Sequence, residues 1–127
     1  MNENTVVERT IKYLQDKGWT IKEKHLGHEQ KVDIKAFHPK NRRYYYIEAK
    51  GDPGKDSKSA GAQKENYFIS AIGEIVLRIK SEKAPLYGIA LPESYEQKLK
   101  KIDKKVMKRL NLHFLIVREN GKVNDIH

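Results

Sequence analysis

Asp33, Glu48 and Lys50 are the residues whose types and spacing best suit hydrolytic chemistry. Asp33 lies in residues 32–37, where apolar and polar side chains alternate, and Glu48 and Lys50 lie at the end of the aromatic run 43–49. Both segments are typical of β-strands. Residues two apart in a strand point to the same side of the sheet, so the Glu48 carboxylate and the Lys50 ammonium are expected on one face.

The turn between these segments sets the distance between the two acids. Residues 38–41 have turn chemistry, which predicts a β-hairpin. If the hairpin turns symmetrically about Lys40 and Asn41, residues whose numbers sum to 81 pair, and Asp33 lies opposite Glu48. Directly opposed side chains have Cβ atoms about 4.5–5.5 Å apart, where two carboxylates repel each other unless a cation lies between them. The pair suits Mg²⁺ or Mn²⁺, which are hard ions that prefer oxygen ligands.

Lys50 extends this arrangement from metal binding to a reaction. Its ammonium could orient an attacking water and stabilise charge on a phosphate, while the metal lowers the pKa of water and polarises the phosphoryl group. These are the requirements of phosphodiester hydrolysis. The alternative is an exposed sheet face on which Glu48 pairs with Lys35 or Lys50 through surface ion pairs, each worth about 0–1 kcal/mol.

The segments that must position these residues predict an α/β fold. Strand patterns occur at 19–21, 32–37, 43–49, 86–91 and 114–117, and Asn120-Gly121 predicts a last hairpin. Helical spacing of apolar residues predicts helices over 5–16 and 62–80 and a third from Ser94. The order α-β-β-β-α-β-α-β implies a central mixed β-sheet flanked by helices, in a single domain over residues 1–127.

The second and third helices carry more specific expectations. Ser70 and Glu74 lie opposite the apolar stripe of the second helix, so we expect solvent exposure for both. Ser94 and Gln97 form a capping box that would start the third helix. The residues expected on its buried side are Tyr95, Leu99, Ile102, Val106 and Leu110.

Composition favours a polyanion as partner. Lys and Arg total 26 against 17 acidic residues, giving a net charge of +9, which favours nucleic acid through counterion release. No apolar run is long enough to cross a bilayer, so no membrane partner is expected. The sequence has no cysteine and no signal-peptide pattern at its start, which fits a cytoplasmic location.

The motif residues resemble a known superfamily. Asp33 in an apolar strand, a turn, and Ile47-Glu48-Ala49-Lys50 ending the next strand resemble the core of the PD-(D/E)xK nucleases, which have the restriction-endonuclease-like fold with its α-β-β-β-α-β core. Glu8 on the first helix resembles the upstream acid of many members. Gln63 and Tyr67 resemble the Gln-x-x-x-Tyr element on the helix that follows the loop.

This resemblance implies roles for individual residues. Asp33, Glu48 and the main-chain carbonyl of Ala49 would hold Mg²⁺ or Mn²⁺, Lys50 would be the catalytic lysine, and DNA would be the substrate. Val32 stands where the proline that names the motif would be.

A second resemblance covers most of the chain. Residues 16–21, 47–50, 71–74 and 86–95 are similar to XisH-like proteins, which are associated with DNA-element excision in cyanobacteria. Glu74 stands where those proteins tend to have glutamine. The likeness implies a common fold.

The hypothesis that combines these signals is a metal-dependent endonuclease that hydrolyses DNA phosphodiester bonds, with Glu8, Gln63 and Tyr67 supporting Asp33, Glu48 and Lys50. Basic loop residues would contact DNA phosphates, namely Arg42, Arg43, Lys55 and Lys58. A homodimer would supply the two active sites that duplex cleavage needs. One alternative is a non-catalytic DNA-binding or recombination accessory protein that retains the nuclease fold. Another is a structural or interaction protein whose charge keeps it soluble.

Two tyrosines and two histidines are also candidates for contacts. Tyr44 and Tyr46 share the face of Glu48, where a ring could stack on a base, although packing on the sheet is the usual role of strand aromatics. The spacing of His25 and His28 could suit a transition metal, but a metal site would need two further ligands. We interpret both histidines as loop residues.

Overall fold

The computed structural model describes residues 1–25, 32–54, 60–79 and 85–127. Their elements, in chain order, are α1 (Glu3–Asp16), β1 (Thr20–Lys24), β2 (Ile34–His38), β3 (Arg43–Ala49), α2 (Ala60–Arg78), β4 (Leu86–Pro92), the 3₁₀-helix η1 (Glu93–Lys101), α3 (Lys104–Leu110), β5 (Leu112–Val117) and β6 (Val123–Ile126). These elements follow the predicted order of helices and strands, except that η1 and α3 replace a single third helix. Asn2 caps the start of helix α1, since its side chain accepts from the Thr5 N–H, and the helix ends before Gly18, which has a φ of +93°.

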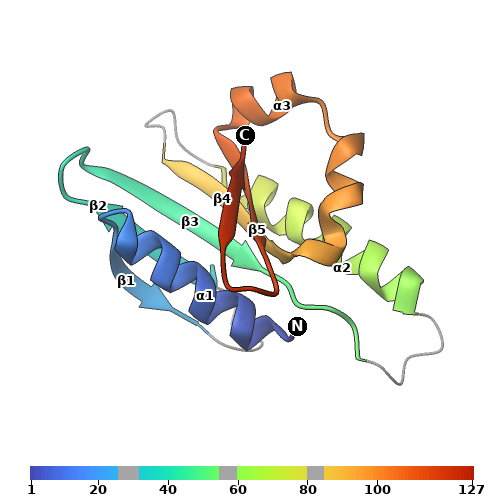
Figure 1. The fold of residues 1–127 in the computed structure, drawn as a ribbon. Coiled ribbons are helices and arrows are strands. Elements are labelled where there is room, and N and C mark those ends of the chain that lie inside the picture. The colour runs from blue at the N-terminus through green and yellow to red at the C-terminus, as the bar shows by residue number, and fades with distance from the viewer. Residues whose placement is uncertain (26–31, 55–59, 80–84) are drawn as a thin grey trace.

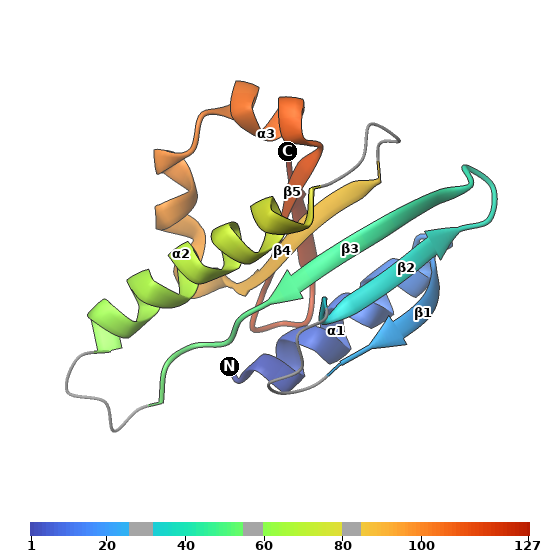
Figure 2. The ribbon, with the colours of Figure 1, turned by 180° about the vertical axis from the view of Figure 1, so that it is seen from behind.

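The described strands form one mixed sheet in the order β1-β2-β3-β4-β5-β6. Strands β3, β4 and β5 are parallel, and the strands outside them pair antiparallel. Helix α1 covers one face of the sheet, as Figure 1 shows, and α2 covers the other, as Figure 2 shows from behind. The predicted α/β class with a mixed, helix-flanked sheet is confirmed.

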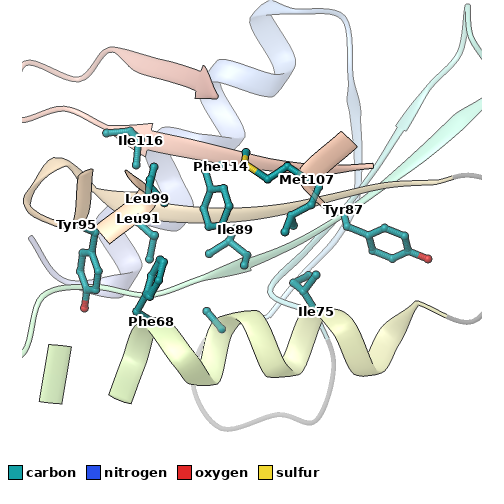
Figure 3. Close-up of a cluster of buried hydrophobic side chains, with 12 residues drawn as sticks. Phe68, Ile75, Tyr87, Ile89, Leu91, Tyr95, Leu99, Met107, Phe114 and Ile116 are labelled. Atoms are coloured by element: carbon teal, nitrogen blue, oxygen red, sulfur yellow. The ribbon is translucent and has the colours of Figure 1, made fainter. Parts of the chain in front are cut away.

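Each face of the sheet packs its own apolar cluster. On the α2 face, Phe68 and Ile75 contact strand residues such as Ile89 and Phe114, and η1 and α3 extend the same cluster (Figure 3). On the α1 face, the helix buries residues against Ile34 and Ile47. Because side chains alternate along a strand, the neighbours of Ile34 and Ile47 point toward α2.

The β2–β3 hairpin has the register that the sequence predicts. Ile34 pairs with Ile47 and Lys35 with Tyr46, so paired residue numbers sum to 81. Asp33 directly precedes β2 and lies across from Glu48. The turn places Arg42 in the left-handed region, with a φ of +53°, and its N–H donates to the His38 carbonyl at 2.8 Å.

The predicted third helix differs most from the structure. It is divided into η1 and α3, and no side chain caps η1, so the expected capping box is wrong. Ser94 instead donates to Asp52. Asp103 starts α3 by accepting from the Lys105 N–H at 2.7 Å, which resets the helical phase and buries Met107 while Val106 is exposed. No helix in the described parts of the chain has the length and apolar character to span a membrane.

Candidate active site

Asp33 and Glu48 form the centre of the site. They are only 7% and 3% exposed, and Thr10 is the only other polar residue that is buried among the described residues. The Asp33 carboxylate accepts from the Ala49 N–H at 2.7 Å and lies within hydrogen-bonding reach of Glu48. The hairpin register therefore brings the two buried carboxylates into contact on the α2 face of the sheet.

Helix α2 adds two charged residues to this pair. Glu74 shares a hydrogen bond with Glu48, and Arg78 donates from Nε to Oε1 of Glu48 at 3.1 Å. Arg78 favours the ionised carboxylate, but burial and the neighbouring Glu74 and Asp33 outweigh it and raise the pKa of Glu48 to about 9. Burial also raises the pKa of Asp33. Without a further cation, Glu48 holds a proton at neutral pH.

Lys50 lies beside the carboxylates, as its spacing from Glu48 predicts. Its Nζ lies 3.4 Å from Oε1 of Glu74. The backbone after Lys50 is held on two sides, since the Tyr95 hydroxyl donates to the Gly51 carbonyl at 2.9 Å and the start of α1 packs against Gly51. A Cβ at Gly51 would lie 2.4 Å from the Glu3 nitrogen, so only glycine permits this close approach.

The donor set fits a hard divalent cation. Three carboxylates, Asp33, Glu48 and Glu74, face two cationic side chains, Lys50 and Arg78, so the fully ionised cluster has one excess negative charge. Mg²⁺ and Mn²⁺ take carboxylate oxygens and would replace the proton on Glu48. Asp33 and Glu48 are the residues that would hold the ion. The Ala49 main chain reaches the cluster through its N–H, and a metal-binding role for its carbonyl stays a prediction.

Gln63 and Tyr67 lie on the same stripe of α2 as Glu74 and Arg78. At 100° per residue, positions 63, 67, 74 and 78 fall within about 60° of one another around the helix. The rise of 1.5 Å per residue places Tyr67 about 10 Å and Gln63 about 16 Å from Glu74 along the axis. They therefore lie about two and three helical turns of α2 away from Glu74.

The other predicted site residues lie farther away. Glu8 belongs to α1, on the opposite face of the sheet, where it is mostly exposed and lies 3.8 Å from Lys24. Arg42 and Arg43 lie at the β2–β3 turn, about 17 Å along β3 from Glu48 at 3.3 Å per residue. Lys55, Lys58 and His28 lie outside the described residues.

Aromatic side chains extend from the site along the sheet. The rings of Tyr44 and Tyr46 lie 6.2 Å apart and nearly parallel, Phe37 lies 4.9 Å from Tyr44, and Lys35 lies over Tyr44 at 5.1 Å. Tyr44 is exposed. We call these four residues, Phe37, Tyr44, Tyr46 and Lys35, the aromatic strip. The tyrosines pack on the sheet, as expected for strand aromatics, and leave part of Tyr44 open to a ligand.

Sequence reasoning missed the roles of Glu74 and Arg78. Glu74 was expected in solvent, and its side chain is indeed 42% exposed, but its carboxylate contacts both Glu48 and Lys50. The signal for these roles is the polar stripe of the helix, because Arg78 continues the series formed by Gln63, Tyr67 and Glu74. A polar stripe on a helix after a catalytic strand can face a site as well as solvent.

A second group of ionisable residues was also missed. His113 on β5, Asp125 on β6 and His127 directly after β6 lie together on the α1 face of the sheet. The available signal was the Asn120-Gly121 turn, because a hairpin there brings the segments that contain residues 113 and 127 side by side.

A basic cleft lies apart from both groups. It lies between α1 and the β5–β6 turn and is lined by basic residues that include Arg9, Lys12, Lys17 and Lys122. Arg9 is committed to the protein, since its guanidinium donates to the carbonyls of Arg118 and Glu119. The lining of this cleft does not include Asp33, Glu48 or Lys50, so the cleft is not part of the candidate site.

The fold and site together define an α/β protein with a mixed six-stranded sheet and a buried carboxylate pair beside a lysine. Two solved structures are similar to this fold. An XisH family protein from Nostoc punctiforme matches with a TM-score of 0.58 and 18% identity, over 97% of this chain and 99% of that chain. An fdxN element excision controlling factor protein from Anabaena variabilis matches with a TM-score of 0.55 and 18% identity, over 98% of this chain and 99% of that chain. No protein-family model and no curated protein matches the sequence. The XisH-like layout is thus confirmed at the level of the fold.

Proposed function

We propose that this protein is a Mg²⁺- or Mn²⁺-dependent endonuclease that acts on DNA, with Asp33 and Glu48 as metal ligands and Lys50 as the catalytic lysine. One observation carries the proposal. Two adjacent carboxylates are buried beside a lysine ammonium, and such burial is costly unless a cation or a proton compensates it. A sheet that needed only stability would bury apolar residues at these positions.

The residues around the pair have distinct tasks in this reaction. Lys50 provides a positive charge that can bind a phosphate oxygen and stabilise the charge that builds up on it. Glu74 holds the Lys50 ammonium near the carboxylates, and Arg78 holds the Glu48 carboxylate in place. A divalent cation, when bound, supplies Lewis-acid activation of water and of the phosphoryl group.

The surface beside the site suits a nucleic-acid substrate. The net charge of +9 favours a polyanion, and the aromatic strip offers Tyr44 for stacking with a base while Lys35 lies above it. One structural neighbour is named for control of the excision of the fdxN element, which agrees with a function on DNA. Tyr67 and Gln63 would contact the backbone of a strand that approaches along α2.

Plasmid nicking by matched lysine variants tests the catalytic proposal. Lys50→Ala should reduce Mg²⁺- or Mn²⁺-dependent nicking by roughly 10²–10³-fold, the usual loss for one charge-stabilising donor. Lys98→Ala is the control, because Lys98 is also 20% exposed and also pairs with a glutamate of α2, Glu65. Equal activity in the two variants, or no nicking by the wild type with either ion across plasmid, linear and single-stranded DNA, would refute the proposal.

The same assay reports on a homodimer. One copy offers one site, so a monomer should nick plasmid DNA and leave few double-strand breaks. Double-strand breaks that increase with the square of protein concentration would indicate that two copies act together.

The second candidate is a DNA-binding protein that does not cleave. The aromatic strip favours it, since stacking and positive charge suffice for binding without a reaction. Fluorescence anisotropy with labelled DNA distinguishes the candidates. Salt-sensitive binding that Tyr44→Ala weakens, without hydrolysis by the wild type, would establish binding alone.

A further inference from the structure

We propose that His113, Asp125 and His127 form a second metal site, specific for a borderline transition-metal ion such as Zn²⁺. It lies on the opposite face of the sheet from Asp33 and Glu48 and is independent of the proposed nuclease function. Among the parts of the chain that the structure describes, this is the one set of three His, Cys, Asp or Glu residues whose ligand atoms all lie within 4.8 Å of one another.

The three side chains already converge on one point. Nδ1 of His113 lies 2.8 Å from Oδ1 of Asp125, and Nδ1 of His127 lies 3.3 Å from the same oxygen. The two imidazole rings are stacked, with centroids 4.5 Å apart and an angle of 20° between planes. Both histidines thus present the same ring nitrogen to the same carboxylate.

The sheet produces this convergence. Strands β5 and β6 are antiparallel, with Phe114 opposite Ile126 and Leu115 opposite Asp125. Continuing this register by one residue places His113 opposite His127, and alternation puts both histidines on the face of Leu115 and Asp125. Leu115 belongs to the cluster under α1, so the site faces α1.

A ring from the neighbouring strands holds His113 in position. The ring of Tyr45 lies across Gly88 and meets the His113 ring edge-on, with centroids 5.9 Å apart. Gly88 pairs with Ile47 on one side and with His113 on the other, and a Cβ there would lie 2.7 Å from Tyr45. The glycine therefore lets Tyr45 reach His113, and this contact orients one ligand before any metal binds.

The ligand set selects the metal. Two imidazole nitrogens and one carboxylate oxygen are a known combination for Zn²⁺, and tetrahedral ligands at about 2.0–2.1 Å from the ion are about 3.3 Å apart. The two histidine nitrogens lie 2.8 and 3.3 Å from Oδ1 of Asp125, close to this value, and all three ligand atoms lie within 4.8 Å of one another. Mg²⁺ prefers oxygen ligands and should not compete here. Three protein ligands leave one position for water or for a group from a partner.

Without a metal, the same residues can form two histidine–aspartate ion pairs, so the experiment must separate these states. Titration of the untagged full chain with Zn²⁺ by calorimetry should show one site with a dissociation constant in the micromolar range or lower. His127→Gln and Asp125→Asn should each weaken binding at least tenfold, on the order of the loss seen when metal-site residues are replaced. His127 is 63% exposed, so its replacement leaves the core intact.

A matched control removes another histidine. His25 lies 3.3 Å from Glu23 and does not belong to the group formed by His113, Asp125 and His127, so His25→Gln should leave the affinity unchanged. Co²⁺ provides a second readout, because its visible spectrum should show nitrogen coordination in the wild type and lose it in His127→Gln. The proposal is refuted by absence of Zn²⁺ binding, by affinity equal in all variants, or by binding that Glu48→Gln abolishes.

Discussion

The two faces of the sheet gather ionisable side chains in opposite ways. On the α2 face, Asp33 and Glu48 are almost fully buried and carry only oxygen donors. On the α1 face, His113 and Asp125 are 16% and 28% exposed, and the histidines bring nitrogen ligands to the rim of the sheet. Strand alternation alone separates these groups, since both are built from neighbouring strands of one sheet.

The difference shows how burial and donor type divide the chemistry. A buried carboxylate pair must be compensated by a proton or a cation, so its protonation and its metal binding are coupled. Solvent can reach the histidine cluster when no metal is bound, mainly at His127, so the cluster costs little in the free protein. The α2 face is thus suited to a reaction, and the α1 face to a metal that ties β5 to β6.

The largest predicted effect is a reciprocal loss of metal function in two double variants. Asp33→Asn with Glu48→Gln should abolish Mg²⁺-dependent nicking, by about 10³-fold or more, because the oxygen ligands and their charge are removed. The same variant should bind Zn²⁺ as the wild type does. His113→Gln with His127→Gln should reverse the pattern. Nicking assays and calorimetry on both proteins check this, and a loss of both activities in either variant would show that the faces are coupled.

The next effect concerns Gly88, which connects Tyr45 to the histidines. Gly88→Ala should destabilise the protein by about 1–3 kcal/mol, because the new methyl group overlaps the Tyr45 ring. It should also weaken Zn²⁺ binding while Mg²⁺-dependent nicking per folded molecule is unchanged. Urea denaturation measures the free energy of unfolding.

Gly73→Ala is the matched control for Gly88→Ala. A Cβ at Gly73 meets nothing within 4 Å, and alanine is favoured over glycine inside a helix by about 0.5–1 kcal/mol. The control should therefore be neutral or stabilising. Similar destabilisation by both substitutions would mean that the Tyr45 ring does not restrict position 88.

The sequence predicted the α2 face better than the α1 face. The hairpin register followed from a local turn and placed Asp33 opposite Glu48. Because side chains alternate along a strand, the face of each residue is predicted correctly even when the ends of the strand are misplaced by a residue or two. Glu74 and Arg78 approach this pair only through packing of α2 on the sheet, which depends on contacts between distant segments. A polar stripe does not reveal which of its residues meet another element.

The α1 face illustrates a second limit. Asn120-Gly121 predicts a turn, but the strand pairing that follows depends on the length of the loop, and the Arg118 N–H donates to the Lys122 carbonyl to give a three-residue loop. A two-residue loop would have shifted the pairing by one residue. The division of the third predicted helix at Asp103 has a similar origin, since one capping residue changed which side chains are buried.

The pH dependence of stability tests the protonation of the buried carboxylate pair on the α2 face. The pKa of Glu48 is raised from 4.5 to about 9 by burial and by Glu74 and Asp33, so the folded state binds more protons than the unfolded state between these values. Stability in EDTA should be highest near pH 5 and should fall as pH rises toward 9. Glu48→Gln should flatten this profile and stabilise the metal-free protein at pH 8 by about 1–3 kcal/mol. Thermal unfolding from pH 5 to 9 measures it, and a wild-type profile that rises over this range would contradict the assignment.

The smallest effect comes from two buried hydroxyls on the α1 face. Oγ1 of Thr10 and the Tyr45 hydroxyl are buried and have no hydrogen-bond partner among the described residues, although the α2 face satisfies its buried carboxylates. Thr10→Val keeps the shape of the side chain and removes an unpaired polar atom, so it should be neutral or stabilise the protein by up to about 1 kcal/mol. Asp33→Asn replaces a carboxylate that accepts a hydrogen bond from the Ala49 N–H, so it should lower the free energy of unfolding. Urea denaturation of both variants in EDTA compares them. Destabilisation by Thr10→Val would show that an ordered water satisfies this hydroxyl, and the contrast between the two faces would then rest on the carboxylates and the histidines alone.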